Sequence, residues 1–589
     1  MTTKEESHRH TISELLQRRA SRNTKDIAFS FPELGQHYAW SRVWEETSGI
    51  ARGFMASGIV KGDRVAVLIQ GQMELILSMF AAACIGAIIV PLNSYSKKEE
   101  LRVLLKDSRP AAMVVGLEGH GLHYAQLMRE LVEEEKSSEE EHISGWMPSS
   151  IFVLGDGEES ASPLMPYSEL ARRGKSVRDE EFEERCRTVR TEDPLILLYT
   201  SGTSGRPKGV LRTTSSFLVR SGGNYNKGEA TLVEALTDRV ARRFSLLNLL
   251  PLYHLGGFAT LFTALKVCNI RIVMLNYFNP IHALTVLAGE RCQIMSGTPF
   301  MIRQMLSSPR RAEFDLSSLL GISFTSAPMN SSLLRKVSSD PGLRLVFFMV
   351  SYGSSEAGAV ANGICFLNRR KNPLWSLLYI LLKSTSFLSG MVDPRELERN
   401  GFSFGGKIDQ GVEIKIVEQG TSQELPYGGH GEIAIRSHRV MRYLNSEETR
   451  GRYTEDGFYL SGDLGFTDER RNLMITGRLN RVISRGGEKI SPGEVEHVLA
   501  QQQGVEDAFV LGLPDELYGE QVYACVVPSA AAMLSEEGLR SAIAPYLSAF
   551  KIPRHIVIVP ALPMSATGKI AVSDVRLLLR NRIEDIKNA

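Results

Sequence analysis

One glycine-rich loop constrains this chain more than any other feature. Residues 199–209 read YTSGTSGRPKG and follow the apolar run 195–198, which predicts a buried strand ending at the loop. Its three glycines permit close backbone approach, and its hydroxyls and amides suit phosphate oxygens. The spacing is not that of a Walker A loop, Gly-x-x-x-x-Gly-Lys-Ser/Thr. A polar surface turn would not need so many phosphate-type donors, so the loop predicts nucleotide binding.

Length and composition narrow the class of protein. A chain of 589 residues is too long for one hydrophobic core, and several domains are expected. Its 43% hydrophobic and 23% charged residues are typical of a soluble enzyme, and its net charge of +1 gives no sign of nucleic-acid binding. Six scattered cysteines without metal-site spacing indicate reduced thiols in a cytoplasmic protein.

No membrane segment is expected. Residues 1–10 are polar and do not resemble a signal peptide. The most apolar stretch, 75–92, ends in Ile-Ile-Val-Pro and predicts a helix that leads into a buried parallel strand. The acidic residues 133–135 and 139–141 predict a solvated loop or helix end without a function.

The order of the predicted elements indicates an α/β fold. Helical stretches alternate with apolar strands, which favours layered parallel sheets, and the strands are expected at 64–69, 112–115, 151–154 and 195–199. A second, smaller α+β unit begins near Arg481, with a helix at 494–499 and strands at 507–513 and 521–527. We therefore expect a large N-terminal domain, residues 1–479, and a small C-terminal domain, residues 480–589.

The loop resembles the phosphate loop of the adenylate-forming superfamily, which includes acyl-CoA synthetases, peptide-synthetase adenylation domains and luciferases. Further motifs similar to those of the family follow in the same order, from about residue 12 to about residue 580. They are Ser-Ala-Pro at 326–328, Tyr-Gly-Ser-Ser-Glu at 352–356, Ser-Gly-Asp at 461–463, Gly-Arg at 477–478, and Ser-Ala-Thr-Gly-Lys at 565–569. The resemblance implies a large domain joined to a small domain that rotates between two catalytic poses.

The resemblance implies a role for each motif in binding ATP. The phosphates would be held by Thr200, Ser201, Gly202, Thr203, Ser204, Gly205, Lys208 and Ser355, and Tyr352 would also contact ATP. Glu356 and Thr200 would hold Mg²⁺, for which a carboxylate is a suitable hard ligand. Ser326 and Ala327 would contact adenine, and Asp463 and Arg478 would hold the ribose. Lys569 would offset the repulsion between the substrate carboxylate and the α-phosphate, so Lys569, Lys208 and Glu356 are the expected catalytic residues.

Other positions are assigned to the acyl group, the thiol and the domain movement. The stretch 251–257 reads PLYHLGG and resembles the family's acyl-pocket motif, which places His254, Gly256 and Phe258 at the pocket. Amino-acid-activating relatives usually carry an aspartate near this point, so its absence argues against an amino acid as the substrate. Asn480 stands at the hinge, where aspartate or lysine is usual, and Gly486 and Gly487 would line the tunnel for the thiol.

The expected function is ATP-dependent and Mg²⁺-dependent activation of a carboxylic acid, fatty or aryl, to an acyl-adenylate that is transferred to CoA. An insertion between Gly358 and Gly405, with the apolar stretch 374–382, departs from most relatives. We expect an extra helix there, but a lid, a membrane-surface contact or the insertion of an acyl-AMP ligase would also fit. Such a ligase would load the phosphopantetheine of an acyl carrier protein. A luciferase-like oxygenase and an inactive nucleotide-binding scaffold are more distant alternatives.

Overall fold

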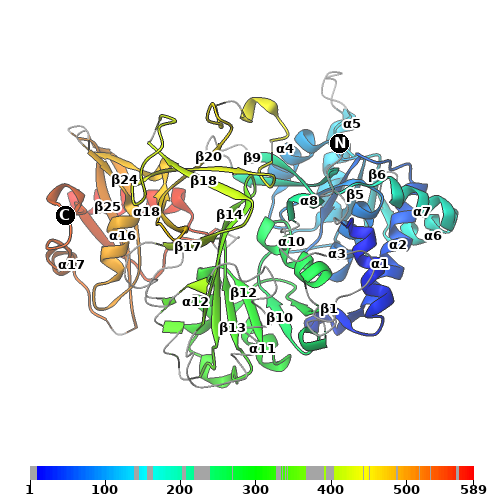
Figure 1. Ribbon diagram of the computed structural model, residues 1–589, viewed down its shortest axis with the longest axis horizontal. Coiled ribbons are helices and arrows are strands. Elements are labelled where there is room, and N and C mark those ends of the chain that lie inside the picture. Colours follow the sequence, from blue (N-terminus) through cyan, green and yellow to red (C-terminus); the bar gives the residue numbers. More distant parts are fainter. Residues whose placement is uncertain are drawn as a thin grey trace. The chain divides into compact units, whose positions relative to one another are not determined.

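The computed structural model describes residues 10–137, 145–155, 164–201, 207–217, 239–267, 269–326, 333–334, 336–337, 340, 342–366, 391–392, 403–418, 420–441, 443–449, 451–485, 488–515, 518–530, 532–565 and 569–588. The chain forms two compact units. The first comprises residues 1–296, 354–358 and 438–450, and the second comprises 297–353, 359–437 and 451–589. Each is described separately below, and Figure 1 gives the positions of the elements along the chain.

The first unit contains a seven-stranded sheet that is parallel except at one edge. Its order is β7 (Leu164–Pro166), β6 (Ser150–Val153), β5 (Ala112–Val115), β3 (Arg64–Leu68), β4 (Ile88–Pro91), β8 (Pro194–Ser201) and β9 (Pro207–Thr213). Only β8 and β9 pair in antiparallel fashion. The expected strands and the parallel arrangement are confirmed.

Helices cover both faces of this sheet because successive side chains of each strand point to opposite sides. On β3, Val65 and Val67 join one apolar core and Ala66 and Leu68 another. The first core contains residues of α1 (Ile12–Arg22), α2 (Trp40–Ala56) and α3 (Met73–Cys84), and the second contains residues of α4 (Lys98–Ser108) and α5 (Tyr124–Ser137). Helix α3 leads into the wholly buried strand β4, as predicted.

A second group of strands in the first unit runs in the order β2 (Gln36–Ala39), β1 (Ile27–Phe31), β11 (Arg271–Met274), β10 (Ser245–Asn248) and β12 (Ile294–Gly297). All neighbours are parallel apart from β1 and β2. The described residues of this unit also form α6 (Ser168–Gly174), α7 (Asp179–Thr188), α8 (Thr214–Phe217), α10 (Leu255–Phe262) and α11 (Pro280–Gly289).

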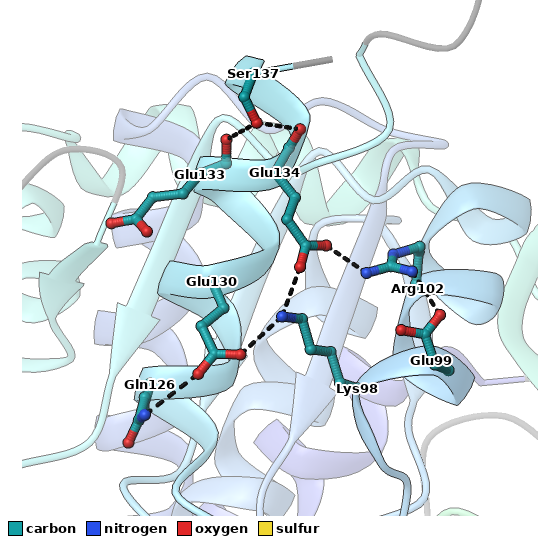
Figure 2. A network of polar contacts seen from close by, with 8 residues as sticks. All are labelled: Lys98, Glu99, Arg102, Gln126, Glu130, Glu133, Glu134 and Ser137. Carbon is teal, nitrogen blue, oxygen red and sulfur yellow. Dashed lines mark hydrogen bonds and ion pairs between the residues drawn. The ribbon is translucent and has the colours of Figure 1, made fainter.

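Two acidic residues of α5, Glu130 and Glu134, belong to a network of ion pairs with α4 (Figure 2). Lys98 Nζ lies 2.8 Å from Glu130 Oε2 and 2.5 Å from Glu134 Oε1, and Arg102 pairs with both Glu134 and Glu99. The expectation of a helix end is thus confirmed for residues 133–135, which close α5, whereas residues 139–141 lie outside the described part of the chain.

The second unit begins with α12 (Pro299–Leu306) and a parallel pair, β13 (Gly321–Phe324) and β14 (Phe347–Ser354). An antiparallel sheet follows in the order β15 (Gly358–Phe366), β17 (Ser403–Ile408), β21 (Asn472–Arg478), β20 (Tyr459–Thr467), β19 (Gly431–Ser437) and β18 (Val412–Val417). Strand β16 (Met391–Val392) pairs with β15. The apolar stretch 374–382, where we expect an extra helix, lies outside the described residues.

The end of the chain forms a small α+β layer structure (orange to red in Figure 1). Its strands are β22 (Ile483–Arg485), β23 (Glu488–Ile490), β24 (Val505–Asp515), β25 (Gly519–Pro528) and β26 (His555–Ile558). Alternate residues of β24 face one core with α16 (Pro492–Ala500) and α17 (Glu536–Ile543), and the others face a second core with α18 (Val572–Asn588). The predicted helix and both predicted strands are confirmed.

Two further expectations can be compared with the described residues. Five of the six cysteines fall within them, and all five are free thiols in buried positions. Among the helices of the described part of the chain, none combines the length and apolar character needed to cross a bilayer.

Candidate functional site

The glycine-rich loop joins the antiparallel strands β8 and β9. Thr200 is the register partner of Lys208, and Ser201 is the partner of Pro207, so the loop begins where β8 ends, as predicted. Residues 202–206, which include the expected phosphate contacts Gly202, Thr203, Ser204 and Gly205, lie outside the described part of the chain. Within it, the hairpin places the Thr200 hydroxyl and the Lys208 ammonium on paired positions.

Tyr443 links this hairpin to Glu356 within the first unit. Its hydroxyl donates a hydrogen bond of 2.8 Å to Glu356 Oε1, and the Lys208 Nζ lies 5.8 Å from the centre of its ring. The neighbouring Leu444 amide donates to the Gly209 carbonyl of β9 at 2.7 Å. We call Thr200, Lys208, Glu356 and Tyr443 the phosphate cluster.

The phosphate cluster fits a metal that arrives with a nucleotide. Mg²⁺ in nucleotide sites usually has one or two protein carboxylates, with phosphate and water oxygens completing its six ligands. Glu356 supplies one such carboxylate, and Tyr443 fixes one of its two oxygens. A single carboxylate held in this way suits a metal that is bound jointly by protein and phosphate.

A second group of polar residues lies in the second unit, where β20 and β21 pair. Asp463 of β20 is the register partner of Arg478, the last residue of β21. Arg478 Nε lies 2.9 Å from Asp463 Oδ1, and the Tyr352 hydroxyl donates to Asp463 Oδ2 at 2.8 Å. We call Tyr352, Asp463 and Arg478 the ribose cluster. Three residues predicted from separate motifs thus meet in one hydrogen-bonded group.

The electrostatics of the ribose cluster keep Tyr352 as the donor and Asp463 as the acceptor of their hydrogen bond. Burial first, and then the negative charge of Asp463, raises the pKa of Tyr352 well above its usual value. Tyr352 therefore stays protonated and donates to the carboxylate at any physiological pH. Asp463 is almost fully buried, and its two oxygens are bound by different side chains, Arg478 at Oδ1 and Tyr352 at Oδ2.

The turn before Asp463 is shaped by glycine. Gly462 has φ of +72°, a conformation that other residues rarely adopt. Its amide donates to Glu432 Oε1 at 2.9 Å, and the Asp463 amide donates to the Ser461 hydroxyl at 3.1 Å. Burial raises the pKa of Glu432. The Ser-Gly-Asp motif is therefore held by a buried acid that sequence reasoning did not identify.

Ser326 of the predicted adenine motif and Ser355 of the predicted phosphate motif lie within the described residues. Ser326, two residues beyond β13, has φ of +69°, which is uncommon for a residue with a side chain. Ala327 lies outside the described residues. Ser355 belongs to the five-residue segment 354–358 that is part of the first unit.

The predicted acyl-pocket residues surround the start of α10. His254 is the residue before the helix, and its ring lies 4.6 Å from that of Tyr253. Gly256 accepts a hydrogen bond from Thr260 through its carbonyl. Phe258 is buried against Phe217, with ring centres 5.3 Å apart. The structure thus places Phe258 in the apolar core, and the acyl-pocket assignment stays a prediction.

The remaining predicted residues lie toward the end of the chain. Asn480 is in a 3-10 turn, η7 (Leu479–Arg481), between β21 and β22. Gly486 and Gly487 are outside the described residues. Lys569 is exposed, and its carbonyl accepts a hydrogen bond of 2.7 Å from the Ser565 amide.

Comparison with known proteins decides the family. The profile of the AMP-binding enzymes matches residues 16–444, and that of the AMP-binding enzyme C-terminal domain matches residues 494–569. The chain belongs to the AMP-binding enzyme family. Its large N-terminal and small C-terminal parts are those of an adenylate-forming enzyme.

Several members of the AMP-binding family resemble the chain over nearly its whole length. The medium-chain acyl-CoA ligase ACSF2 of Danio rerio is 26% identical, covering 96% of this chain and 88% of the relative. Indoleacetate–CoA ligase of Aromatoleum aromaticum is 27% identical, covering 97% and 98%. The structure of ATP-bound MatB from Rhodopseudomonas palustris has a TM-score of 0.72 at 22% identity and covers 98% of this chain and 100% of its own.

Proposed function

We propose that this AMP-binding enzyme activates a fatty or aryl carboxylic acid with ATP and transfers the acyl group to CoA, releasing AMP and pyrophosphate. The observation that carries the proposal is the convergence of Tyr352 and Arg478 on the carboxylate of Asp463. A buried carboxylate of fixed orientation is a suitable acceptor for the hydroxyl protons of a ribose. The names of the CoA ligases above support the choice of acceptor.

In the first step a substrate carboxylate attacks the α-phosphate of ATP, and pyrophosphate leaves. The phosphate cluster would bind the triphosphate through Thr200 and Lys208, and Glu356 would hold Mg²⁺, which neutralises phosphate charge when bound. Lys569 would stand between the two anions that react and lower their repulsion. The product is a mixed anhydride. Its AMP is a good leaving group, which a free carboxylate does not have.

In the second step a thiol attacks the acyl carbon and AMP leaves. We propose that residues 480–589 rotate about Asn480 to bring Gly486 and Gly487 to the adenylate, where they leave room for pantetheine. The ribose cluster would hold the nucleotide in both steps because ribose is common to ATP, acyl-adenylate and AMP.

The apolar character of the predicted pocket favours an acid with an apolar tail. Phe258 packs against the rings of Phe217 and Phe262, so its surroundings in the predicted pocket are aromatic. The acyl and indoleacetate substrates in the names of the relatives agree with an apolar or aryl acid.

The proposal is tested by measuring pyrophosphate release and thioester formation in parallel. Fatty acids of graded length, benzoates and cinnamates are supplied with ATP and with either CoA or a phosphopantetheinylated carrier protein. Acid-dependent pyrophosphate release followed by acyl-CoA formation is expected. Thioester on the carrier protein alone would favour an acyl-AMP ligase, oxygen consumption by the adenylate would favour an oxygenase, and no acid-dependent release would favour a nucleotide-binding scaffold.

The variant Lys569→Ala separates the two steps. Because Lys569 is proposed to act only on the attack at the α-phosphate, adenylation should fall by about a hundredfold or more, the range of a lost charge stabiliser. Thioester formation from preformed acyl-adenylate should continue at the wild-type rate. Equal losses in both half-reactions would contradict this role.

A further inference from the structure

Arg212 is a buried arginine that the proposed mechanism does not use. It lies on β9, four residues after Lys208, and only 1% of its surface is exposed. Its guanidinium carbon lies 5.2 Å from the centre of the Phe217 ring. An arginine is rarely buried without a specific set of partners, because removing its charge from water is costly.

The partners of Arg212 are main-chain carbonyls, and three of the four belong to segments far away in the sequence. Nη1 donates to the Ser355 carbonyl at 2.7 Å and approaches the Glu356 carbonyl at 3.5 Å. Nη2 donates to the Arg439 carbonyl at 3.1 Å and approaches that of Ser216 at 3.4 Å. One side chain thus joins β9 to the segments 354–358 and 438–450, which carry Glu356 and Tyr443 of the phosphate cluster.

These segments are also joined to each other. The Met441 amide donates to the Glu356 carbonyl at 2.8 Å, and the Tyr443 hydroxyl donates to the Glu356 side chain. Arg212 therefore holds the main chain on both sides of the contact that orients the Glu356 carboxylate.

Gly358 provides the space for Arg212. A Cβ atom on Gly358 would lie 2.6 Å from Arg212 Nη2, and the residue has φ of +71°. Both the close approach and the positive φ require glycine here. The turn after Glu356 is thus shaped to admit the guanidinium.

The charge of Arg212 persists at neutral pH. Burial lowers its pKa to about 9; nearby Glu356 opposes this shift, and Arg439 adds to it. A charged guanidinium makes stronger hydrogen bonds to carbonyls than a neutral donor does, and its planar fork reaches several acceptors at once.

We propose that Arg212 is a positioning residue that fixes Glu356 relative to β9 and its Lys208, and that it thereby supports the binding of Mg²⁺ with ATP. The proposal rests on the proposed role of Glu356. It predicts a defect confined to ligands that carry the β- and γ-phosphates with the metal, because the carbonyls that Arg212 holds belong to the phosphate cluster and not to the ribose cluster.

The test measures equilibrium binding of ATP and of AMP by calorimetry, each with excess Mg²⁺ and with EDTA. Arg212→Met should weaken ATP binding in Mg²⁺ by about tenfold or more, the effect expected when hydrogen bonds from a charged donor are lost. AMP binding should change by less than about twofold. Arg212→Lys, which keeps the charge but not the fork, should fall between Arg212→Met and wild type.

A matched control is available in the same unit. Arg19 of α1 is also buried, and its Nε donates to the Leu265 carbonyl at 3.0 Å. Arg19→Met should lower thermal stability without the selective loss of Mg²⁺-dependent ATP binding. Equal losses for ATP and AMP in Arg212→Met, or the same selective loss in Arg19→Met, would overturn the proposal.

Two more variants separate the proposal from its premise. If Glu356→Gln removes the effect of Mg²⁺ on ATP binding but Arg212→Met does not, the role of Arg212 is refuted alone. If neither variant has an effect, Glu356 is not at the metal and both ideas fail. If Arg212→Met does not fold, Gly358→Ala serves in its place, because the added Cβ pushes against Arg212 Nη2. This variant should show the same selective loss of Mg²⁺-dependent ATP binding. ATP binding equal to that of the wild type would overturn the proposal.

Discussion

Asp463 illustrates how a single residue can be fixed by partners from different elements. Tyr352 comes from β14, Arg478 from β21 and Asp463 from β20, and all three belong to the second unit. Because the carboxylate is almost fully buried and doubly hydrogen-bonded, it has little freedom to turn. Such preorganisation lowers the entropy cost of binding a ligand.

Removing this carboxylate should weaken the binding of ATP and the binding of AMP by the same amount, because both nucleotides carry a ribose. Asp463→Ala should lower the affinities for ATP and AMP by about ten- to a hundredfold, since hydrogen bonds to a charged acceptor contribute about 1.5–3 kcal/mol. Tyr352→Phe, which leaves the carboxylate in place, should have a smaller effect. Calorimetric titration of both nucleotides checks this, and loss of ATP binding alone would show that Asp463 acts on phosphate.

Sequence motifs predicted those residues of the phosphate and ribose clusters that stand in a recognisable local sequence pattern. Lys208, Glu356 and Asp463 each lie beside glycine or hydroxyl residues that mark a loop. Tyr443 and Arg212 lie outside the motifs that the sequence analysis used. Their contacts with Glu356 and Ser355 bridge 87 and 143 residues, and only the folded chain brings these positions together.

At the scale of elements, α2 and α6 approach each other at a glycine. A Cβ on Gly53 of α2 would lie 2.2 Å from the Leu170 carbonyl oxygen of α6, a distance that real side chains do not reach. Gly49, one turn earlier on the same helix, would place its Cβ in open space. The two positions share a helix and differ in their packing.

Substituting the two glycines should change stability in opposite directions. Gly53→Ala should lower the free energy of unfolding by about 1–3 kcal/mol, the usual cost of overpacking. Gly49→Ala should raise it by about 0.5–1 kcal/mol because alanine favours the helix. Urea unfolding at equilibrium measures both, and a loss at Gly49 would show that its helix face is covered.

The ion pairs between α4 and α5 (Figure 2) should contribute to stability in a pH-dependent way. Hydrogen bonds from Lys98 chiefly lower the pKa of Glu130 and of Glu134 below the ordinary value of 4.5. A carboxyl group with a lowered pKa in the folded state stabilises the fold above its unfolded pKa, and this effect is lost as the pH falls.

The double variant Glu130→Gln, Glu134→Gln should therefore melt at a slightly lower temperature at pH 7, by about 1 °C or less for exposed pairs. The difference from wild type should shrink below pH 4.5. It should also shrink in 1 M salt, where the screening length is about 3 Å. Scanning calorimetry checks both trends, and a difference that persists in salt would indicate a packing effect.

The strands that the sequence predicted were those with continuous apolar runs. Parallel strands covered on both faces, such as β3 and β5, consist almost entirely of buried apolar residues, and their bounds were predicted within about one residue. The antiparallel strands β17–β21 were not predicted. Their burial is mixed and their partners lie up to about 70 residues away, so local pattern carries little of their signal.

At the scale of the whole molecule, the proposed domain movement depends on the backbone at Asn480. In this structure Asn480 belongs to a 3-10 turn, whose φ of about −50 to −70° is compatible with proline. Rotation about this residue requires other values of φ, which proline cannot adopt. Proline here would hold the chain in the observed backbone state.

Asn480→Pro should therefore separate the two half-reactions. Whichever half-reaction uses the observed backbone state should stay within about threefold of wild type, and the other should fall by about a hundredfold. We expect thioester formation to be the step that is lost. Asn480→Ala, which leaves φ free, should support both steps. Pyrophosphate release and acyl-CoA formation are measured separately, and full activity in both steps for the proline variant would exclude a hinge at Asn480.

The chain passes between its two units several times, and this affects how it can fold during synthesis. The first unit needs residues 438–450, although its main segment ends at residue 296. At about 5–20 residues per second, a ribosome adds the intervening stretch in roughly seven to thirty seconds. Throughout that interval the Arg212 guanidinium of the nascent chain lacks the Arg439 carbonyl, so water or a chaperone must solvate its charge until translation supplies the missing segment.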